Sequence, residues 1–130
     1  MAMDIGALSG EVEEFLAVRH LASLTTLRAD GRPHVVPVGF SWDGEHRLVR
    51  IITRAGSQKV RNAGRAGATA SVCQIDGGRW LTLSGPATVT DDPDRVAEAV
   101  RRYSARYREP EPRPDRVAIE IAVTEILGRA

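Results

Sequence analysis

The sequence has 130 residues, of which 42% are hydrophobic and 27% are charged. These values are typical of a globular domain and argue against disordered, collagen-like and fibrous proteins, and the length predicts a single domain over residues 1–130. No apolar run approaches the roughly 20 residues that a membrane-spanning helix needs, and the first residues lack the basic and apolar segments of a signal peptide. A single cysteine, Cys73, excludes an internal disulfide. We therefore expect a cytoplasmic protein.

The charge balance bears on the kind of partner. The formal net charge is only +1, whereas a nucleic-acid-binding domain is expected to be basic overall or over one face. Lys59 is the only lysine among the 18 basic residues, an arginine bias that GC-rich coding also produces. We expect neither a nucleic acid nor a membrane as a partner.

The first part of the chain predicts one short helix and three strands. Ser9 is suited to cap a helix whose first turns carry Glu11, Glu13 and Glu14 near the positive end. Asp-Gly pairs at residues 30–31 and 43–44 favour hairpin turns. The strands that these turns join are expected at residues 20–27, 34–42 and 46–53.

The second of these strands contains residues that disturb a regular sheet. Pro37 lacks a backbone N–H, and Gly39 has no side chain to pack. Together they indicate a bulge, an edge strand, or the close approach of a flat group.

The rest of the chain predicts two helices and three strands. The helices are expected at residues 57–65 and after the Asp92-Pro93 cap, and the strands at residues 68–75, 79–90 and 117–123, the last after a proline-rich connector. The helix after Asp92-Pro93 has an apolar stripe formed by Val96, Val100, Tyr103 and Tyr107. Its three arginines, Arg101, Arg102 and Arg106, are expected to face water. Six strands joined mostly by hairpins, with short flanking helices, predict a mainly β fold with a closed or partly closed antiparallel barrel.

The sequence shows no familiar catalytic or metal-binding constellation. The three histidines, His20, His34 and His46, fall on separate predicted strands, and CxxC, HExxH and GxSxG motifs are missing. Cys73 has the character of a small buried hydrophobic residue. We expect no metal site and no nucleophilic side chain.

Residues 52–62 pass from a strand end into the start of a helix, where free backbone N–H groups attract anions. Ser57 adds a hydroxyl donor, and Lys59 and Asn62 are three residues apart, hence on one helix face. Arg54 and Arg61 add charge on either side. The segment is consistent with an anion site, but taken alone it favours slightly an ordinary surface helix capped by serine.

Arg79-Trp80 is a second candidate. A tryptophan at a strand start belongs to the core or to a dimer contact, or it stacks on a flat ligand whose acidic tail pairs with Arg79.

Three segments together resemble a known family. Residues 24–40 (LTTLRADGRPHVVPVGF), 57–62 (SQKVRN) and 76–85 (DGGRWLTLSG) resemble the split β-barrel flavin and deazaflavin oxidoreductases, often called pyridoxamine 5'-phosphate oxidase-like. The resemblance extends from about His20 to the last strand. It is strongest to the coenzyme F420-dependent biliverdin reductases, down to the Arg-Tyr-Arg-Glu-Pro sequence that begins at Arg106.

The resemblance implies a split six-stranded antiparallel barrel that forms a homodimer, with two cofactors in the grooves between subunits. By motif position it implies that Ser57, Gln58, Lys59 and Asn62 hold the cofactor phosphate, that His34, Val35, Val36, Pro37 and Val38 lie along the flavin or deazaflavin ring, and that Ile52 and Thr53 lie near the ribityl chain. It further implies that Gln74, Arg79 and Trp80 reach in from the other subunit or close the ring pocket.

Three functions are compatible with this resemblance. The first is a reductase in which coenzyme F420 passes a hydride from its C5 carbon to a conjugated small-molecule acceptor, a tetrapyrrole such as biliverdin. The second is an FMN-dependent oxidoreductase acting on pyridoxamine phosphate, against which stands the lack of the longer C-terminal extension of such oxidases. The third is a non-catalytic flavin, deazaflavin or haem binder, which would use the same residues.

Overall fold

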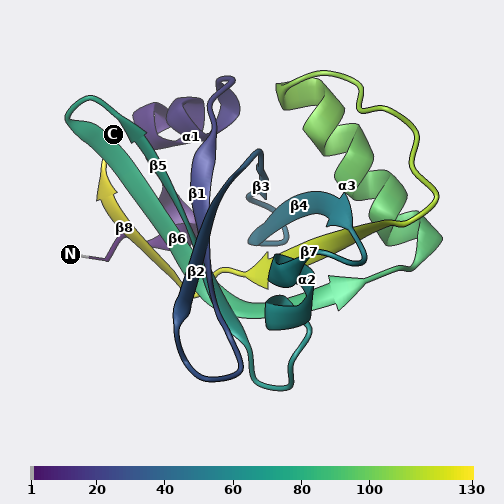
Figure 1. Ribbon diagram of the computed structural model, residues 1–130. Coiled ribbons are helices and arrows are strands. Elements are labelled where there is room, and N and C mark those ends of the chain that lie inside the picture. The colour runs from purple at the N-terminus through teal and green to yellow at the C-terminus, as the bar shows by residue number, and fades with distance from the viewer. Residues whose placement is uncertain (1) are drawn as a thin grey trace.

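The computed structural model describes residues 2–130 and contains eight strands, three α-helices and one 3₁₀ turn (Figure 1). In chain order they are the 3₁₀ turn Ile5–Ala7, α1 Gly10–Ala17, β1 Ala22–Leu27, β2 Pro33–Val38, β3 Ser41–Asp43, β4 Leu48–Arg54, α2 Gln58–Ala63, β5 Thr69–Asp76, β6 Arg79–Thr90, α3 Pro93–Arg106, β7 Arg116–Ala122 and β8 Glu125–Arg129. The predicted mainly β, antiparallel fold with short helices is confirmed. No helix within residues 2–130 is long and apolar enough to cross a membrane.

Strand β6 pairs with three other strands and so connects the two parts of the sheet. The strands follow the order β2-β1-β5-β6-β7-β4-β3, and β8 adds to β6. β6 pairs with β5 over residues 79–86, with β8 over residues 80–84 and with β7 over residues 87–90. Figure 1 shows this long strand running from the β5 hairpin toward the start of α3. One strand therefore belongs to both halves of the barrel.

The barrel is open between its two edge strands, β2 and β3, which stand at opposite ends of the strand order. β2 pairs only with β1, and β3 pairs only with residues 48–50 of β4. On the side opposite β7, residues 51–54 of β4 thus have no partner strand among the described residues. The two edges are joined in the chain by Gly39 and Phe40.

The apolar faces of the strands enclose one core. Val49, Ile51, Leu83 and Ile119 are at most 1% exposed, as the alternation of inward and outward positions in a barrel requires. Phe15 and Leu16 of α1, which Ser9 caps through its side chain, join the same core.

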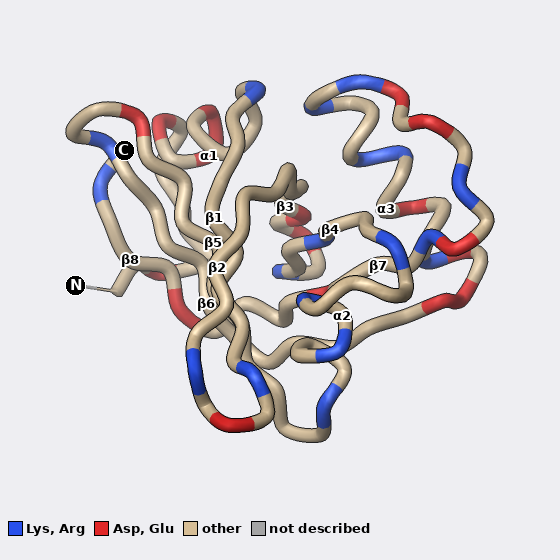
Figure 2. Tube along the Cα trace, in the orientation of Figure 1, with Lys and Arg blue, Asp and Glu red and all other residues tan. Residues whose placement is uncertain are grey.

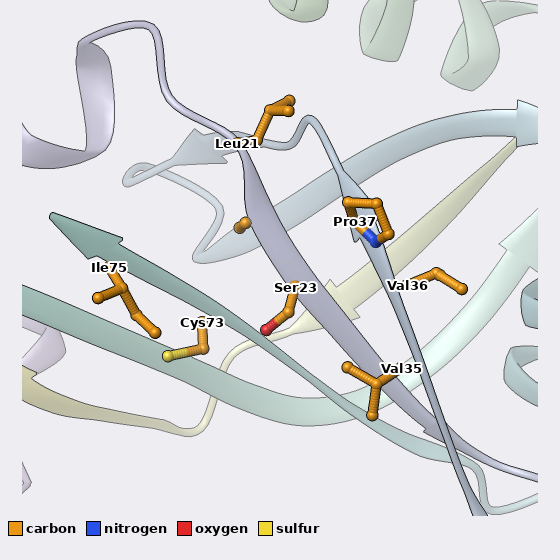
Figure 3. Close-up of a pocket in the computed structure, with 8 residues that line it drawn as sticks. Leu21, Ser23, Val35, Val36, Pro37, Cys73 and Ile75 are labelled. Carbon is orange, nitrogen blue, oxygen red and sulfur yellow. The ribbon is translucent and has the colours of Figure 1, made fainter.

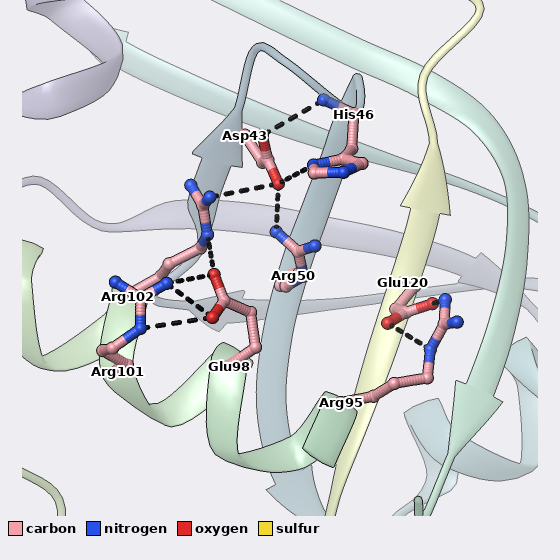
Figure 4. A network of polar contacts seen from close by, with 8 residues as sticks. All are labelled: Asp43, His46, Arg50, Arg95, Glu98, Arg101, Arg102 and Glu120. Atoms are coloured by element: carbon pink, nitrogen blue, oxygen red, sulfur yellow. Dashed lines mark hydrogen bonds and ion pairs between the residues drawn. The ribbon is translucent and has the colours of Figure 1, made fainter.

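Helix α3 packs on the outside of β3, β4 and β7 through a polar network (Figure 4). The Asp43 carboxylate, 2% exposed, accepts hydrogen bonds from Arg50 Nη1 at 2.7 Å and His46 Nδ1 at 2.8 Å, and Arg102 Nη2 lies 3.2 Å away. Arg95 of α3 pairs with the buried Glu120 of β7.

The structure differs from the sequence-based expectation in three places. It has eight strands rather than six: the strand predicted at residues 34–42 ends at Val38 and resumes as β3, and β8 follows the strand that was expected to be last. The break falls at Gly39, where the rings of Tyr103 and Tyr107 leave about 3 Å for a Cβ atom. Arg106, predicted to face water, is only 9% exposed.

Candidate functional site

A cavity of about 350 Å³ lies across the split of the barrel. One wall comes from the end of β2 and the residue after it, and another from the end of β4 and the start of α2. The rest comes from α3, the connector after it and the first residue of β7. The lining residues are Pro37, Val38, Gly39, Ile52, Thr53, Arg54, Lys59, Tyr103, Pro110, Arg113 and Arg116. We call it the basic cavity.

Four cationic side chains line the basic cavity, namely Arg54, Lys59, Arg113 and Arg116, and no carboxylate within residues 2–130 does. Figure 2 shows basic positions at α2 and along the connector after α3. Arg54 and Arg116 are direct cross-strand neighbours in the β4–β7 register, and like charges in that arrangement repel. Burial, and then the charge of Arg54, lowers the pKa of Lys59. An anion in the cavity would relieve this repulsion.

An apolar groove lies on the other side of β2. Its volume is about 360 Å³, and it is lined by residues of β1, β2 and β5 and of the segment just before β1: Leu21, Ala22, Ser23, Val35, Val36, Pro37, Cys73 and Ile75 (Figure 3). Leu21, Val35 and Ile75 are 58–61% exposed, which is unusual for large apolar side chains that lie together. Pro37 lines both the groove and the basic cavity.

The comparison with known proteins fits this architecture. The family model of pyridoxamine 5'-phosphate oxidase matches residues 8–130. The chain belongs to this family. It is 52% identical over 123 residues to an F420H2-dependent biliverdin reductase of Mycobacterium tuberculosis (strain CDC 1551 / Oshkosh), covering 95% of this chain and 89% of that protein.

Solved structures agree with the family assignment. An F420 reductase is 29% identical, with a TM-score of 0.74 over 93% of this chain and 98% of that chain. A conserved hypothetical protein of Mycobacterium tuberculosis has the same fold, with 22% identity and a TM-score of 0.78 over 95% of this chain and 85% of that chain. The predicted resemblance to this family and to its F420-dependent members is confirmed.

In this member of the pyridoxamine 5'-phosphate oxidase family, five of the predicted site residues line the basic cavity: Pro37, Val38, Ile52, Thr53 and Lys59. Ser57 lies at the start of α2 beside them; its side chain makes no capping bond, and its Oγ is 3.5 Å from Thr53 Oγ1. Val35 and Val36 line the apolar groove instead.

His34 is half-buried at the start of β2. Its Nδ1 is buried and has no hydrogen-bond partner within residues 2–130. Burial, followed by the charges of Arg28 and Lys59, lowers the pKa of the imidazole. A buried nitrogen without a partner is a group that a ligand or a water molecule would satisfy.

Asn62 and Gln58 are engaged inside the protein. Asn62 is 2% exposed; its Nδ2 donates to Thr26 Oγ1 at 3.0 Å, and its Oδ1 accepts from Gln58 Nε2 at 2.7 Å. Arg65 also donates to Asn62 Oδ1. These bonds fasten α2 to β1, so in this structure Asn62 orients the helix that carries Lys59 and does not face the cavity.

Gln74, Arg79 and Trp80 lie away from the basic cavity. Gln74 is fully buried and bonds to the Phe15 carbonyl and to Arg106. The Arg79 guanidinium stacks over the Phe15 ring, 4.7 Å from its centroid, and Trp80 is 37% exposed beside it in sequence. The β5–β6 hairpin of this chain does not bring these residues to the cavity.

Sequence reasoning missed two groups of cavity residues. Tyr103, expected on the apolar stripe of its helix, lines the cavity. Pro110 and Arg113 were seen only as part of the proline-rich connector, and Arg116 was not singled out. The pairing of Arg54 with Arg116 joins residues far apart in the chain. No local pattern signals that register.

Proposed function

We propose that this chain is a coenzyme F420-dependent reductase that passes a hydride from C5 of the reduced deazaflavin to a conjugated acceptor of the tetrapyrrole class, such as biliverdin. The observation that carries the proposal is the basic cavity, with four cations and no lining carboxylate, in a chain 52% identical to an F420H2-dependent biliverdin reductase. The 29% identical F420 reductase supports the same cofactor.

The residues of the cavity fit an anionic, flat cofactor. Lys59 and Ser57, with the backbone at Gln58, would hold the phosphate at the start of α2. The edge of β2 from His34 to Val38 has no neighbouring strand on one side among residues 2–130, so its backbone groups are free to meet a flat ring. Ile52 and Thr53 would lie beside the ribityl chain between these two points.

When bound, the deazaflavin supplies the hydride, and the protein supplies position and electrostatics. Lys59 and Arg54 bind the anionic part, and Asn62 keeps the helix that bears Lys59 against β1. Pro37, Val38 and Ile52 present apolar surface that excludes water from the ring. No side chain has to act as a nucleophile, in keeping with a site built from cations and apolar residues.

We also propose a homodimer. The exposed apolar groove of β1, β2 and β5 (Figure 3) supports a second copy as its cover. Arg79 and Trp80, remote from the cavity of their own protomer, would reach a cofactor only from the partner.

The test is a titration of purified protein with coenzyme F420 and, side by side, with FMN, followed by cofactor fluorescence. We expect preference for F420 and, with reduced F420, reduction of biliverdin followed by the absorbance of both reactants. Preference for FMN would favour an FMN-dependent oxidoreductase. Tight F420 binding without turnover of any tetrapyrrole would favour a non-catalytic binder.

A further inference from the structure

Arg106, at the end of α3, is a buried cation without an acidic partner. It is 9% exposed, and no carboxylate within residues 2–130 forms an ion pair with it. Burial lowers the pKa of its guanidinium. Placing a charge in the interior is costly unless its hydrogen bonds are satisfied.

The guanidinium donates to three acceptors from separate segments. Nε donates to the Val18 carbonyl at 2.8 Å, Nη1 to the Phe40 carbonyl at 2.8 Å and Nη2 to Gln74 Oε1 at 2.6 Å. It also stacks on the Phe40 ring, 4.6 Å from the centroid. One planar group thus joins α3, the segment after α1, the link between β2 and β3, and β5.

The neighbouring Tyr107 holds the same link from the other side. Its hydroxyl accepts from the Phe40 N–H at 3.2 Å and donates to the His20 carbonyl at 2.6 Å. Both backbone groups of Phe40 are therefore bound by side chains of α3 and its cap. We call Arg106 and Tyr107 the clamp.

The clamp acts on the wall of the basic cavity. Gly39, next to Phe40, lines the cavity together with Tyr103. The rings of Tyr103 and Tyr107, 4.9 Å apart between centroids, lie against the Cα of Gly39. Gly39 and Phe40 are also the only residues between the two edge strands, β2 and β3, that border the split.

We propose that Arg106 and Tyr107 are positioning residues that fix the Gly39–Phe40 link and thereby the cavity in which the cofactor binds. The part that concerns the cofactor rests on the proposed function. None of the hydrogen bonds of Arg106 and Tyr107 reaches α2 or Lys59. We therefore expect the loss of the clamp to weaken cofactor binding with little change in the rate at saturating cofactor.

The variants Tyr107→Phe and Arg106→Lys test the clamp, with Arg101→Gln as the control. Tyr107→Phe removes only the hydroxyl, Arg106→Lys keeps the charge but not the three-way fork, and Arg101 is exposed on the same helix and pairs with Glu98. We expect the two clamp variants to raise the F420 dissociation constant about tenfold, with kcat at saturation within about twofold of wild type. Arg101→Gln is expected to behave as wild type.

Amide hydrogen exchange in the cofactor-free protein gives an independent readout. In Tyr107→Phe the Phe40 amide is expected to exchange at least about tenfold faster, while that of Leu83 in β6 stays unchanged. Folded variants with unchanged Phe40 exchange and unchanged affinity would overturn the clamp. A wild type that binds no F420 would overturn the proposed function, and Phe40 exchange then decides the clamp alone.

Discussion

Single side chains decide the affinity of the basic cavity. Of the four cations that line the cavity, Lys59 is the one on α2, and burial and then the charge of Arg54 lower its pKa. On the proposed function, Lys59→Ala would remove a charge-assisted hydrogen bond to the cofactor phosphate, and we expect binding to weaken by about 1–3 kcal/mol. Fluorescence titration with F420 measures the change. Arg32→Ala, at an exposed arginine that pairs with Asp30 in the β1–β2 turn, is the control; equal losses in both variants would indicate a general charge effect.

Asp43 is the side chain on which the polar network of α3 depends. Burial by itself raises the pKa of its carboxyl, but hydrogen bonds from Arg50 and His46 and the charge of Arg102 outweigh burial and leave the pKa well below 3.8. Asp43→Asn leaves Arg50 and Arg102 without their shared carboxylate. We expect a loss of about 3 kcal/mol in the free energy of unfolding at pH 7, measured by urea denaturation. The exposed Asp30→Asn should show no measurable change.

The same network predicts the acid side of the stability profile. Hydrogen bonds from Arg101 and Arg102 lower the pKa of Glu98 from 4.5 to about 2, and the pKa of Asp43 is also lowered. Carboxyls with lowered folded-state pKa values stabilise the fold fully above about pH 5, and this contribution is lost as the pH falls through about 4.5 toward 2. As the pH is lowered across this range, the free energy of unfolding should fall less steeply in Asp43→Asn than in the wild type. Parallel curves for the two proteins would contradict a lowered pKa of Asp43 in the folded state.

At the scale of elements, the crossing of β6 between the two half-barrels depends on Gly85. A Cβ at this position would lie 1.9 Å from the Ala122 carbonyl oxygen. We expect Gly85→Ala to lower the free energy of unfolding by more than about 3 kcal/mol, because backbone would have to move. Gly10→Ala, where nothing lies within 4 Å, should change it by less than about 1 kcal/mol. Thermal and urea unfolding measure the free energy of unfolding of both variants, and equal losses would contradict the special role of Gly85.

The elements that the sequence predicted well are those with local signals. Asp30-Gly31 and the alternation of residues 117–123 mark a hairpin and a strand without reference to the rest of the chain, and both appear where expected. β8 was missed because it has only five residues and one of them is Gly128. Gly128 has a φ of +130°, and its backbone lies against that of Trp80. Arg106 was assigned to solvent because helical periodicity does not show which acceptors lie beneath a helix end.

In the candidate site too, residues close together in the sequence were predicted, and residues that only the fold brings together were not. Lys59, Thr53 and Ile52 come from one continuous segment and were predicted together. Arg116 reaches the cavity because β7 pairs with β4 in a register that sets it opposite Arg54, and Arg113 lies in the connector that leads into β7. Asn62 and Gln74 carry amides that suit a ligand or the interior equally, and only packing assigns them to the interior.

At the scale of the whole molecule, the apolar groove predicts the oligomeric state. Val35 lines the groove and is 58% exposed. Burying a charged side chain in a protein interface is unfavourable, so Val35→Glu is expected to convert a dimer to a monomer. Light scattering coupled to size-exclusion chromatography measures the mass. Ala97→Glu, on the exposed side of α3, is the matched control, and a wild type that runs as a monomer would contradict the dimer.

The sharing of β6 between both half-barrels also has a kinetic consequence. The β1–β2 and β5–β6 hairpins join neighbouring segments and can form early. The far end of β6 and residues 51–54 of β4 find their partner strand only in β7, whose residues 116–122 come late in the chain. Until then the edge of β4 stays open, and the nascent chain carries exposed strand edges of the kind that chaperones protect. The walls of the cavity are therefore assembled in the last stage of folding, and a ligand that joins them would speed completion only after β7 has docked.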